Sequence, residues 1–181
     1  MTQSNQVRQL VQLGVIAAFA TLAFVGTLVI RIPIPATGGY FNLGDTFVMI
    51  AALLYGPVAG LVVGAVGPAM ADAVGFPQFI LATAVVKGIE GALVGAISSR
   101  RLSGGGRGRA VVALLVGICV LVIGYYVFEA VVYPALAVRI PFFGVTDRAA
   151  ALAELLPNTA QGIISAVIAF GVWNLFRGRA S

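Results

Sequence analysis

The chain alternates long apolar runs with short polar connections. Residues 10–30 contain no charged side chain, and at about 1.5 Å per residue a helix of this length crosses a hydrocarbon core of about 30 Å. Five further apolar runs follow at residues 45–55, 57–73, 78–98, 110–133 and 156–176. The pattern predicts an all-α, multi-pass membrane protein in which residues 1–181 form one integral membrane domain, a single bundle of six transmembrane helices.

Proline marks the breaks between several of these runs. Gly56-Pro57 separates the second run from the third, because proline disfavours a helical conformation in the residue before it. The two runs are therefore expected to form a short helical hairpin. Pro134 and Pro157 are expected to bound a polar connection between the last two helices.

The arginines are distributed unevenly between the two ends of the predicted bundle. An even number of helices places both chain termini on one side of the membrane. Arginines on that side are Arg8, Arg100, Arg101, Arg107, Arg109, Arg177 and Arg179, and those opposite are Arg31, Arg139 and Arg148. The positive-inside rule then predicts that both termini are cytoplasmic. Because the basic residues stand at the ends of apolar runs, topology explains the net charge of +5 better than nucleic-acid binding does.

The amino-acid composition and the absence of known motifs exclude several classes of function. The chain is 60% hydrophobic and 9% charged, whereas soluble domains carry about a quarter charged residues. It has no histidine and one cysteine, which excludes histidine-containing metal sites and disulfides within the chain. No metalloprotease, nucleophile-elbow or phosphate-loop motif occurs. We therefore expect no enzymatic activity, no metal and no cofactor bound by this chain.

Two charged residues interrupt one of the predicted membrane helices. Lys87 and Glu90 stand three residues apart within residues 79–97, which are otherwise apolar or small and uncharged. A charge in a lipid-facing helix costs about 2.5–3.5 kcal/mol on insertion scales, so such residues usually face a protein interior or a wet cavity. The spacing predicts a buried ion pair between Lys87 and Glu90 inside the bundle.

Other polar side chains occur at a similar depth on the remaining helices, towards the outer side of the membrane. These candidate pocket residues are Asn42, Asp45, Asp72, Tyr125, Glu129, Asn158 and Gln161. Helical spacing places Tyr125 with Glu129, and Asn158 with Gln161, on shared faces. Because the inner half of the membrane has almost no polar residues, the pattern predicts a pocket that opens outward and suits a small, flat, partly polar solute.

Some of these residues also have a purely structural interpretation. Asp45 and Asn158 stand at predicted helix starts, where a side chain can satisfy free backbone groups. Asp72 stands at a predicted helix end, with Gly75 as the cap. Lys87 and Glu90 could simply neutralise one another, but a site role is favoured, either by contact with solute or by holding the pocket in shape.

Small residues recur at helical spacing and predict close contacts between helices. Gly56, Gly60 and Gly64 repeat every four residues, as do Gly91 and Gly95. Such patterns mostly serve packing within one chain. Gly14 and Ala18 form a similar pair on the first helix. That pair either packs internally or faces another membrane subunit.

Several motifs together carry a resemblance to a known family. They are Gly38-Gly39-Tyr40-Phe41-Asn42-Leu43-Gly44-Asp45, Tyr55-Gly56-Pro57, Ala71-Asp72, Lys87-Gly88-Ile89-Glu90-Gly91 and Pro157-Asn158-Thr159-Ala160-Gln161. In this order they resemble the substrate-binding S components of energy-coupling factor (ECF) vitamin transporters. The resemblance is closest to the hydroxymethylpyrimidine and riboflavin-type branch and covers most of the chain.

The resemblance implies a protein of the prokaryotic plasma membrane that captures a small vitamin or vitamin precursor from outside. Its partners would be a transmembrane coupling subunit and two ATPase subunits, which hydrolyse the ATP. In this family the first connecting loop helps to cover the pocket. Residues beside the solute would then be Gly39, Tyr40, Asn42, Lys87, Glu90, Asn158 and Gln161.

The first helix of family members commonly carries Ala-x-x-x-Ala, which meets the coupling subunit. This chain has Gly14-x-x-x-Ala18 there, so the resemblance implies that Gly14 and Ala18 bind this partner. Hydroxymethylpyrimidine, a thiamine precursor, is the favoured substrate, with riboflavin and pyridoxine as further possibilities. The alternative function is a stand-alone membrane channel or facilitator for a small metabolite.

Overall fold

The computed structural model describes residues 3–34, 39–99, 106–137 and 148–177. The helices are α1 (Gln3–Val29), α2 (Gly44–Tyr55), α3 (Pro57–Ala73), the 3-10 turn η1 (Pro77–Phe79), α4 (Ile80–Ser98), α5 (Arg107–Val127), the π-helical turn η3 (Phe128–Val132), α6 (Tyr133–Ala137) and α7 (Arg148–Arg177). A short antiparallel pair, β1 (Ile32–Ile34) and β2 (Gly39–Phe41), lies between α1 and α2. The described chain is therefore almost entirely helical, as the sequence predicts.

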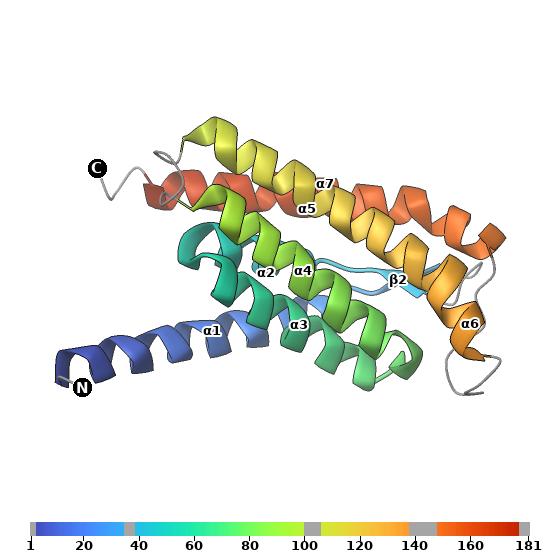
Figure 1. Ribbon diagram of the computed structural model, residues 1–181, viewed down its shortest axis with the longest axis horizontal. Coiled ribbons are helices and arrows are strands. Elements are labelled where there is room, and N and C mark those ends of the chain that lie inside the picture. The colour runs from blue at the N-terminus through green and yellow to red at the C-terminus, as the bar shows by residue number, and fades with distance from the viewer. Residues whose placement is uncertain (1–2, 35–38, 100–105, 138–147, 178–181) are drawn as a thin grey trace.

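The helices run roughly lengthwise beside one another, and α1 extends beyond the bundle at its N-terminal end (Figure 1). The start of α1 and the end of α7 lie at the same end of the molecule, while β2 and α6 lie towards the other (Figure 1). In the part of the chain that the structure describes, four helical segments are long and apolar enough to cross a membrane: Gln3–Val29, Pro77–Ser98, Arg107–Leu136 and Ala151–Arg177. Helices α2 and α3 are shorter apolar helices.

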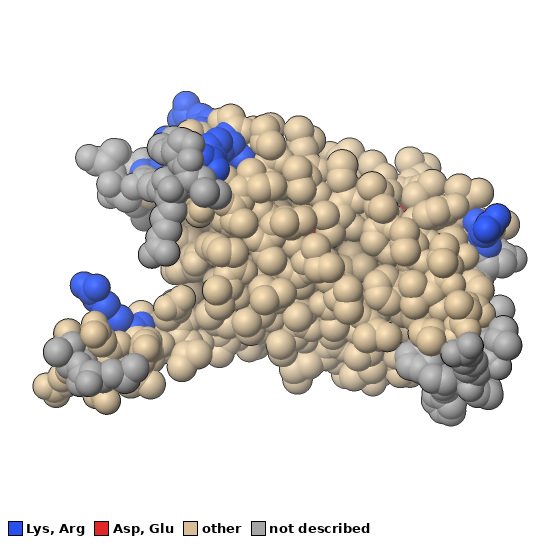
Figure 2. Space-filling model, in the orientation of Figure 1, with Lys and Arg blue, Asp and Glu red and all other residues tan. Residues whose placement is uncertain are grey.

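Basic side chains lie at the two ends of the molecule (Figure 2). Arg107 begins α5 and Arg177 ends α7, whereas Arg148 begins α7 at the opposite end. Arg100, Arg101, Arg139 and Arg179 lie outside the described residues. The exposed surface between the ends is mostly apolar, with side chains such as Leu115, Ile123 and Val167 exposed, as expected of a surface in contact with lipid tails.

Glycine packing brings α3 against α4. The two helices α2 and α3 meet at Gly56, whose positive φ of 88° is readily adopted by glycine, and Pro57 then opens α3 at a position that needs no backbone donor. A Cβ at Gly60 would overlap the backbone of Gly91, and one at Gly64 would overlap the carbonyl of Lys87. These glycines therefore serve packing within the chain.

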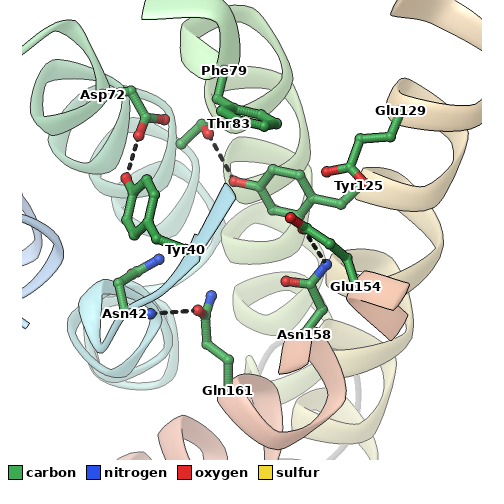
Figure 3. Close-up of a pocket in the computed structure, with 10 residues that line it drawn as sticks. All are labelled: Tyr40, Asn42, Asp72, Phe79, Thr83, Tyr125, Glu129, Glu154, Asn158 and Gln161. Atoms are coloured by element: carbon green, nitrogen blue, oxygen red, sulfur yellow. Dashed lines mark hydrogen bonds between the residues drawn. The ribbon is translucent and has the colours of Figure 1, made fainter. Parts of the chain in front are cut away.

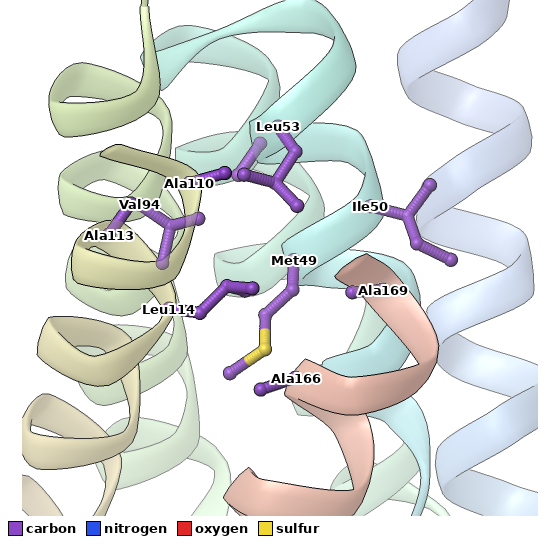
Figure 4. Packing of buried hydrophobic residues seen from close by; sticks show 10 residues of the cluster. Met49, Ile50, Leu53, Val94, Ala110, Ala113, Leu114, Ala166 and Ala169 are labelled. Atoms are coloured by element: carbon purple, nitrogen blue, oxygen red, sulfur yellow. The ribbon is translucent and has the colours of Figure 1, made fainter. Parts of the chain in front are cut away.

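An apolar core lies between α2, α4, α5 and α7 (Figure 4). It contains Met49 and Leu53 of α2, Val94 of α4, Leu114 of α5 and Ala169 of α7, all of them buried. Because these side chains come from four helices, the core holds the bundle together and closes it beneath the polar residues.

The structure corrects the expected connection between the last two helices. Helix α7 begins at Arg148, so Pro157 lies inside it rather than at its start. Pro134 lies within the continuous helical stretch of α5, η3 and α6. Residues 148–155, which the sequence interpretation leaves in this connection, belong to a helix whose neighbours are α2 and α5. Tertiary packing thus overrides the local breaking tendency of proline.

We predict that Gly60→Ala destabilises the protein, because the added methyl group must push α3 away from α4. Overpacking of this kind costs about 1–3 kcal/mol, and the midpoint of thermal unfolding in detergent should fall. Gly171→Ala is the matched control, since a Cβ there meets nothing within 4 Å. Equal midpoints for the two variants would contradict the close approach of the helices.

Candidate functional site

A polar recess lies between the helices and β2 (Figure 3). Its walls come from β2, α3, α4, η3, α5, α7 and the segments that join them. The lining residues are Tyr40, Asn42, Asp72, Phe79, Thr83, Tyr125, Glu129, Glu154, Asn158 and Gln161. The recess measures about 310 Å³ with its open mouth, whereas the free space between the lining atoms is about 20 Å³, room for about one water molecule. A ring compound can enter only if lining side chains move apart.

Most of the predicted pocket residues line this recess, but four do not. Gly39 lies in β2 beside Tyr40 and pairs with Ile34. Asp45, Lys87 and Glu90 are fully buried in the bundle interior and are absent from the lining. We name the group around them, Asn42, Asp45, Lys87, Glu90 and Gln161, the inner polar layer.

The predicted ion pair between Lys87 and Glu90 is wrong. Lys87 Nζ lies 2.5 Å from Asp45 Oδ1, and both side chains are almost completely buried. Both carboxylate oxygens of Glu90 are buried and have no hydrogen-bond partner among the described residues. Asp45 faces Lys87 across the contact between α2 and α4, whereas Glu90 shares the helix of Lys87 and its Cγ lies beside Gly117 of α5. The cross-helix geometry therefore determines the partner.

Gln161 connects this ion pair to the recess. Its Nε2 donates to Asp45 Oδ2 at 2.5 Å, and its Oε1 accepts from the backbone N–H of Asn42 at 2.7 Å. Asn42 Oδ1 accepts from the backbone N–H of Gly44 at 2.9 Å and lies 3.5 Å from Lys87 Nζ. Helices α2, α4 and α7 are thus joined through hydrogen bonds that need no water.

The capping roles considered for Asp45 and Asn158 are also wrong. Leu43 is the N-cap of α2 and makes no side-chain capping bond, while both oxygens of Asp45 are used across helices. Asn158 lies well inside α7, where its Nδ2 donates to Glu154 at 3.4 Å. Asp72 does lie in the last turn of α3, but the cap is Val74. All three side chains are therefore available for tertiary contacts.

Aromatic and charged groups hold β2 over one side of the recess. The Tyr40 hydroxyl donates to Asp72 Oδ1, and the Tyr40 and Phe76 ring centroids are 4.5 Å apart. The guanidinium of Arg31 lies 4.8 Å from the Tyr40 ring centroid and donates to the carbonyl of Ala71. Burial, together with the nearby Asp72 carboxylate, raises the pKa of Tyr40 above its ordinary value. The hydroxyl therefore keeps its proton and remains a donor.

The opposite side of the recess carries two glutamates. Glu129 lies in the π-helical turn η3, a deviation that is frequent at functional sites and redirects a side chain. Glu154 comes from the second turn of α7, and both glutamate side chains are buried. Tyr125 lies beside them, with its hydroxyl 2.7 Å from that of Thr83 (Figure 3).

The sequence interpretation missed Phe79, Thr83 and Glu154 as lining residues. Glu154 was overlooked because the last helix was expected to begin at residue 156. Its spacing from Asn158, Gln161 and Ser165 follows one helical face, and this signal could have identified it. Thr83 shares a face with Lys87 in the same way, whereas Phe79 carries no comparable polar signal.

Gly14 and Ala18 lie far from the recess, on an exposed face of α1. A Cβ at Gly14 would meet no atom within 4 Å. Because Ala18 is also exposed, the structure does not support internal packing of this small-residue pair.

Three comparisons relate the chain to known proteins. The sequence model of a family described as "ECF-type riboflavin transporter, S component" matches residues 4–175. A Pyrococcus woesei protein described as "Uncharacterized protein in gap 3'region" is 34% identical over 155 residues, which cover 86% of this chain and 94% of that protein. A solved structure, "Structure and mechanism of the S component of a bacterial ECF transporter", has a similar fold, with a TM-score of 0.67, 15% identity, and coverage of 96% of this chain and 99% of that one.

We predict that Lys87→Met is strongly destabilising, because it leaves the Asp45 carboxylate buried without its cation. Breaking a buried ion pair from one side costs about 3–5 kcal/mol. The double variant Asp45→Asn/Lys87→Met removes both charges and should recover part of the loss, which thermal unfolding of all three variants in detergent would measure. Simple additivity of the two single changes would contradict direct pairing.

Proposed function

The chain belongs to the family of S components of ECF-type riboflavin transporters, and from this membership and the polar recess we propose that it captures a small vitamin or vitamin precursor from outside the cell. The single observation that carries the proposal is the recess itself. Ten side chains converge there, and most of them are polar. A concave site with converging polar groups and aromatic walls is typical of small-molecule binding.

The favoured substrate is hydroxymethylpyrimidine, a thiamine precursor, with riboflavin and pyridoxine as further candidates. Each has a flat ring that can lie against Tyr40, Phe79 or Tyr125 while amide and carboxyl groups bind its edge. Because the free space is small, the compact pyrimidine requires less movement of the walls than the flavin does.

Entry of the substrate would involve β2. Tyr40 is held by Asp72, Arg31 and Phe76, and these contacts can break and re-form without unfolding a helix. We propose that β2 moves aside to admit the substrate and then returns, so that Tyr40 and Asn42 cover it.

Uptake would depend on partners. Asn42 and Gln161 lead from the recess into the inner polar layer, but beyond it the apolar core around Met49 and Leu114 closes the bundle. The absence of a continuous polar path among the described residues favours capture over conduction by a channel. We propose that a transmembrane coupling subunit and two ATPases drive release to the cytoplasm, with both termini of this chain on the cytoplasmic side.

We expect the purified chain to bind one compound from a panel of vitamins and their precursors saturably. Isothermal titration calorimetry in detergent is the direct measurement, with the pyrimidine, flavin and pyridoxine series in the panel. A folded sample that binds none of them, or a chain that moves solute in liposomes without ATPase partners, would contradict the proposed function.

We expect Gly14→Leu and Ala18→Leu to weaken co-purification with the coupling module, because a bulky side chain prevents close helix approach. Substrate affinity should be unchanged, since both residues lie away from the recess. Gly171→Leu, on an exposed part of α7 with open space around it, is the control. If Gly14→Leu lowers affinity and leaves assembly intact, this surface is not the partner site.

A further inference from the structure

A groove lies at the end of the bundle that carries the start of α1 and the end of α7. Its walls come from Gln12 of α1, the junction of α2 and α3 around Gly56, the end of α4 and the last turns of α7. Its free volume is about 700 Å³, far more than that of the recess, and the two share no lining residue. The groove is therefore a second site, separate from the one that we propose captures the substrate.

The lining of the groove combines apolar and polar side chains. Leu54, Val58 and Phe176 contribute apolar surface, whereas Ser99 and Arg177 contribute polar groups at the ends of α4 and α7. Val58 and Phe176 are exposed, so the groove is open on the apolar outer surface of the bundle. A molecule that has a hydrocarbon chain and a polar head matches this combination.

Arg177 provides the charge of the groove. Its guanidinium carbon lies 5.1 Å from the centroid of the Trp173 ring, a cation–π contact that favours one orientation of the guanidinium. Its Nη1 is buried and has no hydrogen-bond partner among the described residues. Because a buried donor without an acceptor is unfavourable, we expect an external acceptor to bind there.

The described chain has no acidic side chain in this groove. The sequence contains six acidic residues, and the five described ones line the recess or belong to the inner polar layer: Asp45, Asp72, Glu90, Glu129 and Glu154. The sixth, Asp147, lies outside the described residues and precedes the start of α7, whereas Arg177 ends that helix. Arg8, Arg107 and Arg109 add positive charge at the same end of the molecule as Arg177 (Figures 1 and 2). The charge of this end therefore complements an anionic partner.

We propose that the groove binds an anionic phospholipid, with the lipid phosphate on Arg177 and an acyl chain along the apolar walls. Arginine pairs with phosphate through parallel N–H···O hydrogen bonds, and basic pockets between transmembrane helices bind anionic lipid head groups. Trp173 and Tyr55, which also line the groove, are residue types enriched at the depth of the head groups. A free phosphate ion would make no use of the apolar walls. The inference goes beyond the proposed function, and neither depends on the other.

The test is native mass spectrometry of the purified full-length chain in detergent, titrated with four probes. They are dioleoyl phosphatidylglycerol, dioleoyl phosphatidylcholine, glycerophosphoglycerol, which is the anionic head group without chains, and inorganic phosphate. We expect phosphatidylglycerol to bind about 5-fold or more tightly than phosphatidylcholine, whose choline cation opposes the arginines, and neither chain-free anion to bind at the same concentrations. Equal binding of the two lipids would overturn the role of charge. Phosphate that binds as tightly as phosphatidylglycerol would overturn the lipid assignment.

Arg177→Gln should reduce the affinity for phosphatidylglycerol about 5-fold or more, because the neutral amide does not attract the charge of the head group. Arg148→Gln is the matched control, since it removes one positive charge from the exposed first residue of the same helix, and it should leave the affinity unchanged. Equal losses in the two variants would show attraction by net charge alone and overturn the site. An Arg177→Gln chain that binds lipid normally but no longer co-purifies with a coupling module would make the groove a protein surface and overturn the inference as well.

Val58→Trp tests the contact with the acyl chain without changing any charge. The side chain is exposed, so the larger indole can fill part of the groove without disturbing the core, and it should weaken the binding of phosphatidylglycerol. Val167→Trp, at an exposed position outside the groove, should not. The thermal unfolding midpoint of each variant checks that it is folded. Normal lipid binding by both folded variants would show that the acyl chain lies elsewhere and overturn the inference, whereas substrate capture is measured separately and is unaffected by this result.

Discussion

The buried ion pair between Lys87 and Asp45 is the interaction on which the polar interior depends. Each charge alone would be costly in a membrane-embedded bundle, and removal of water is tolerable only when partners satisfy both. Lys87 Nζ and Asp45 Oδ1 are 2.5 Å apart, and Gln161 supplies the second hydrogen bond of the carboxylate. Since the three residues come from α4, α2 and α7, the pair also fixes how these helices face one another. The recess lies next to this ion pair and shares Asn42 and Gln161 with it, so the positions of its walls depend on the pair.

Glycine residues on α3 allow α4 to take the position in which Lys87 meets Asp45. The backbone of α3 lies against α4 at Gly64 and Lys87, where any side chain on residue 64 would strike the Lys87 carbonyl. Close contact on this side leaves the opposite side of α4 free to face α2 and α5 with Lys87, Glu90 and Thr83. The small residues and the buried charges therefore depend on one another. The glycines of α3 set the position of α4, and α4 carries Lys87 and Glu90.

The sequence predicts the helices and the burial of Lys87 well, because apolar length and the energetic penalty of an intramembrane charge are local properties. Partner choice is not local. Glu90 is the nearer carboxylate along the chain, but Asp45 is the one that α2 brings opposite Lys87. Glu154 and the start of α7 were missed for a related reason, since Pro157 indicates a helix start on local grounds, and only the packing of α7 against other helices shows that the helix begins earlier. The π-helical turn that carries Glu129 has no clear sequence signal either.

The division between the recess and the inner polar layer limits how a ligand can be recognised. Asn42 and Gln161 belong to both, and their hydrogen bonds already support Asp45 and the start of α2. A ligand that took a donor from Gln161 would weaken the ion pair that positions the recess. Glu129 and Glu154 line the recess outside the inner polar layer, whose Asp45 is bound by Lys87 and Gln161, so contacts on the glutamate side can form without disturbing that layer. We therefore expect the ligand to be bound mainly on the side of Glu129 and Glu154, while Asn42 and Gln161 hold the helices in their relative positions.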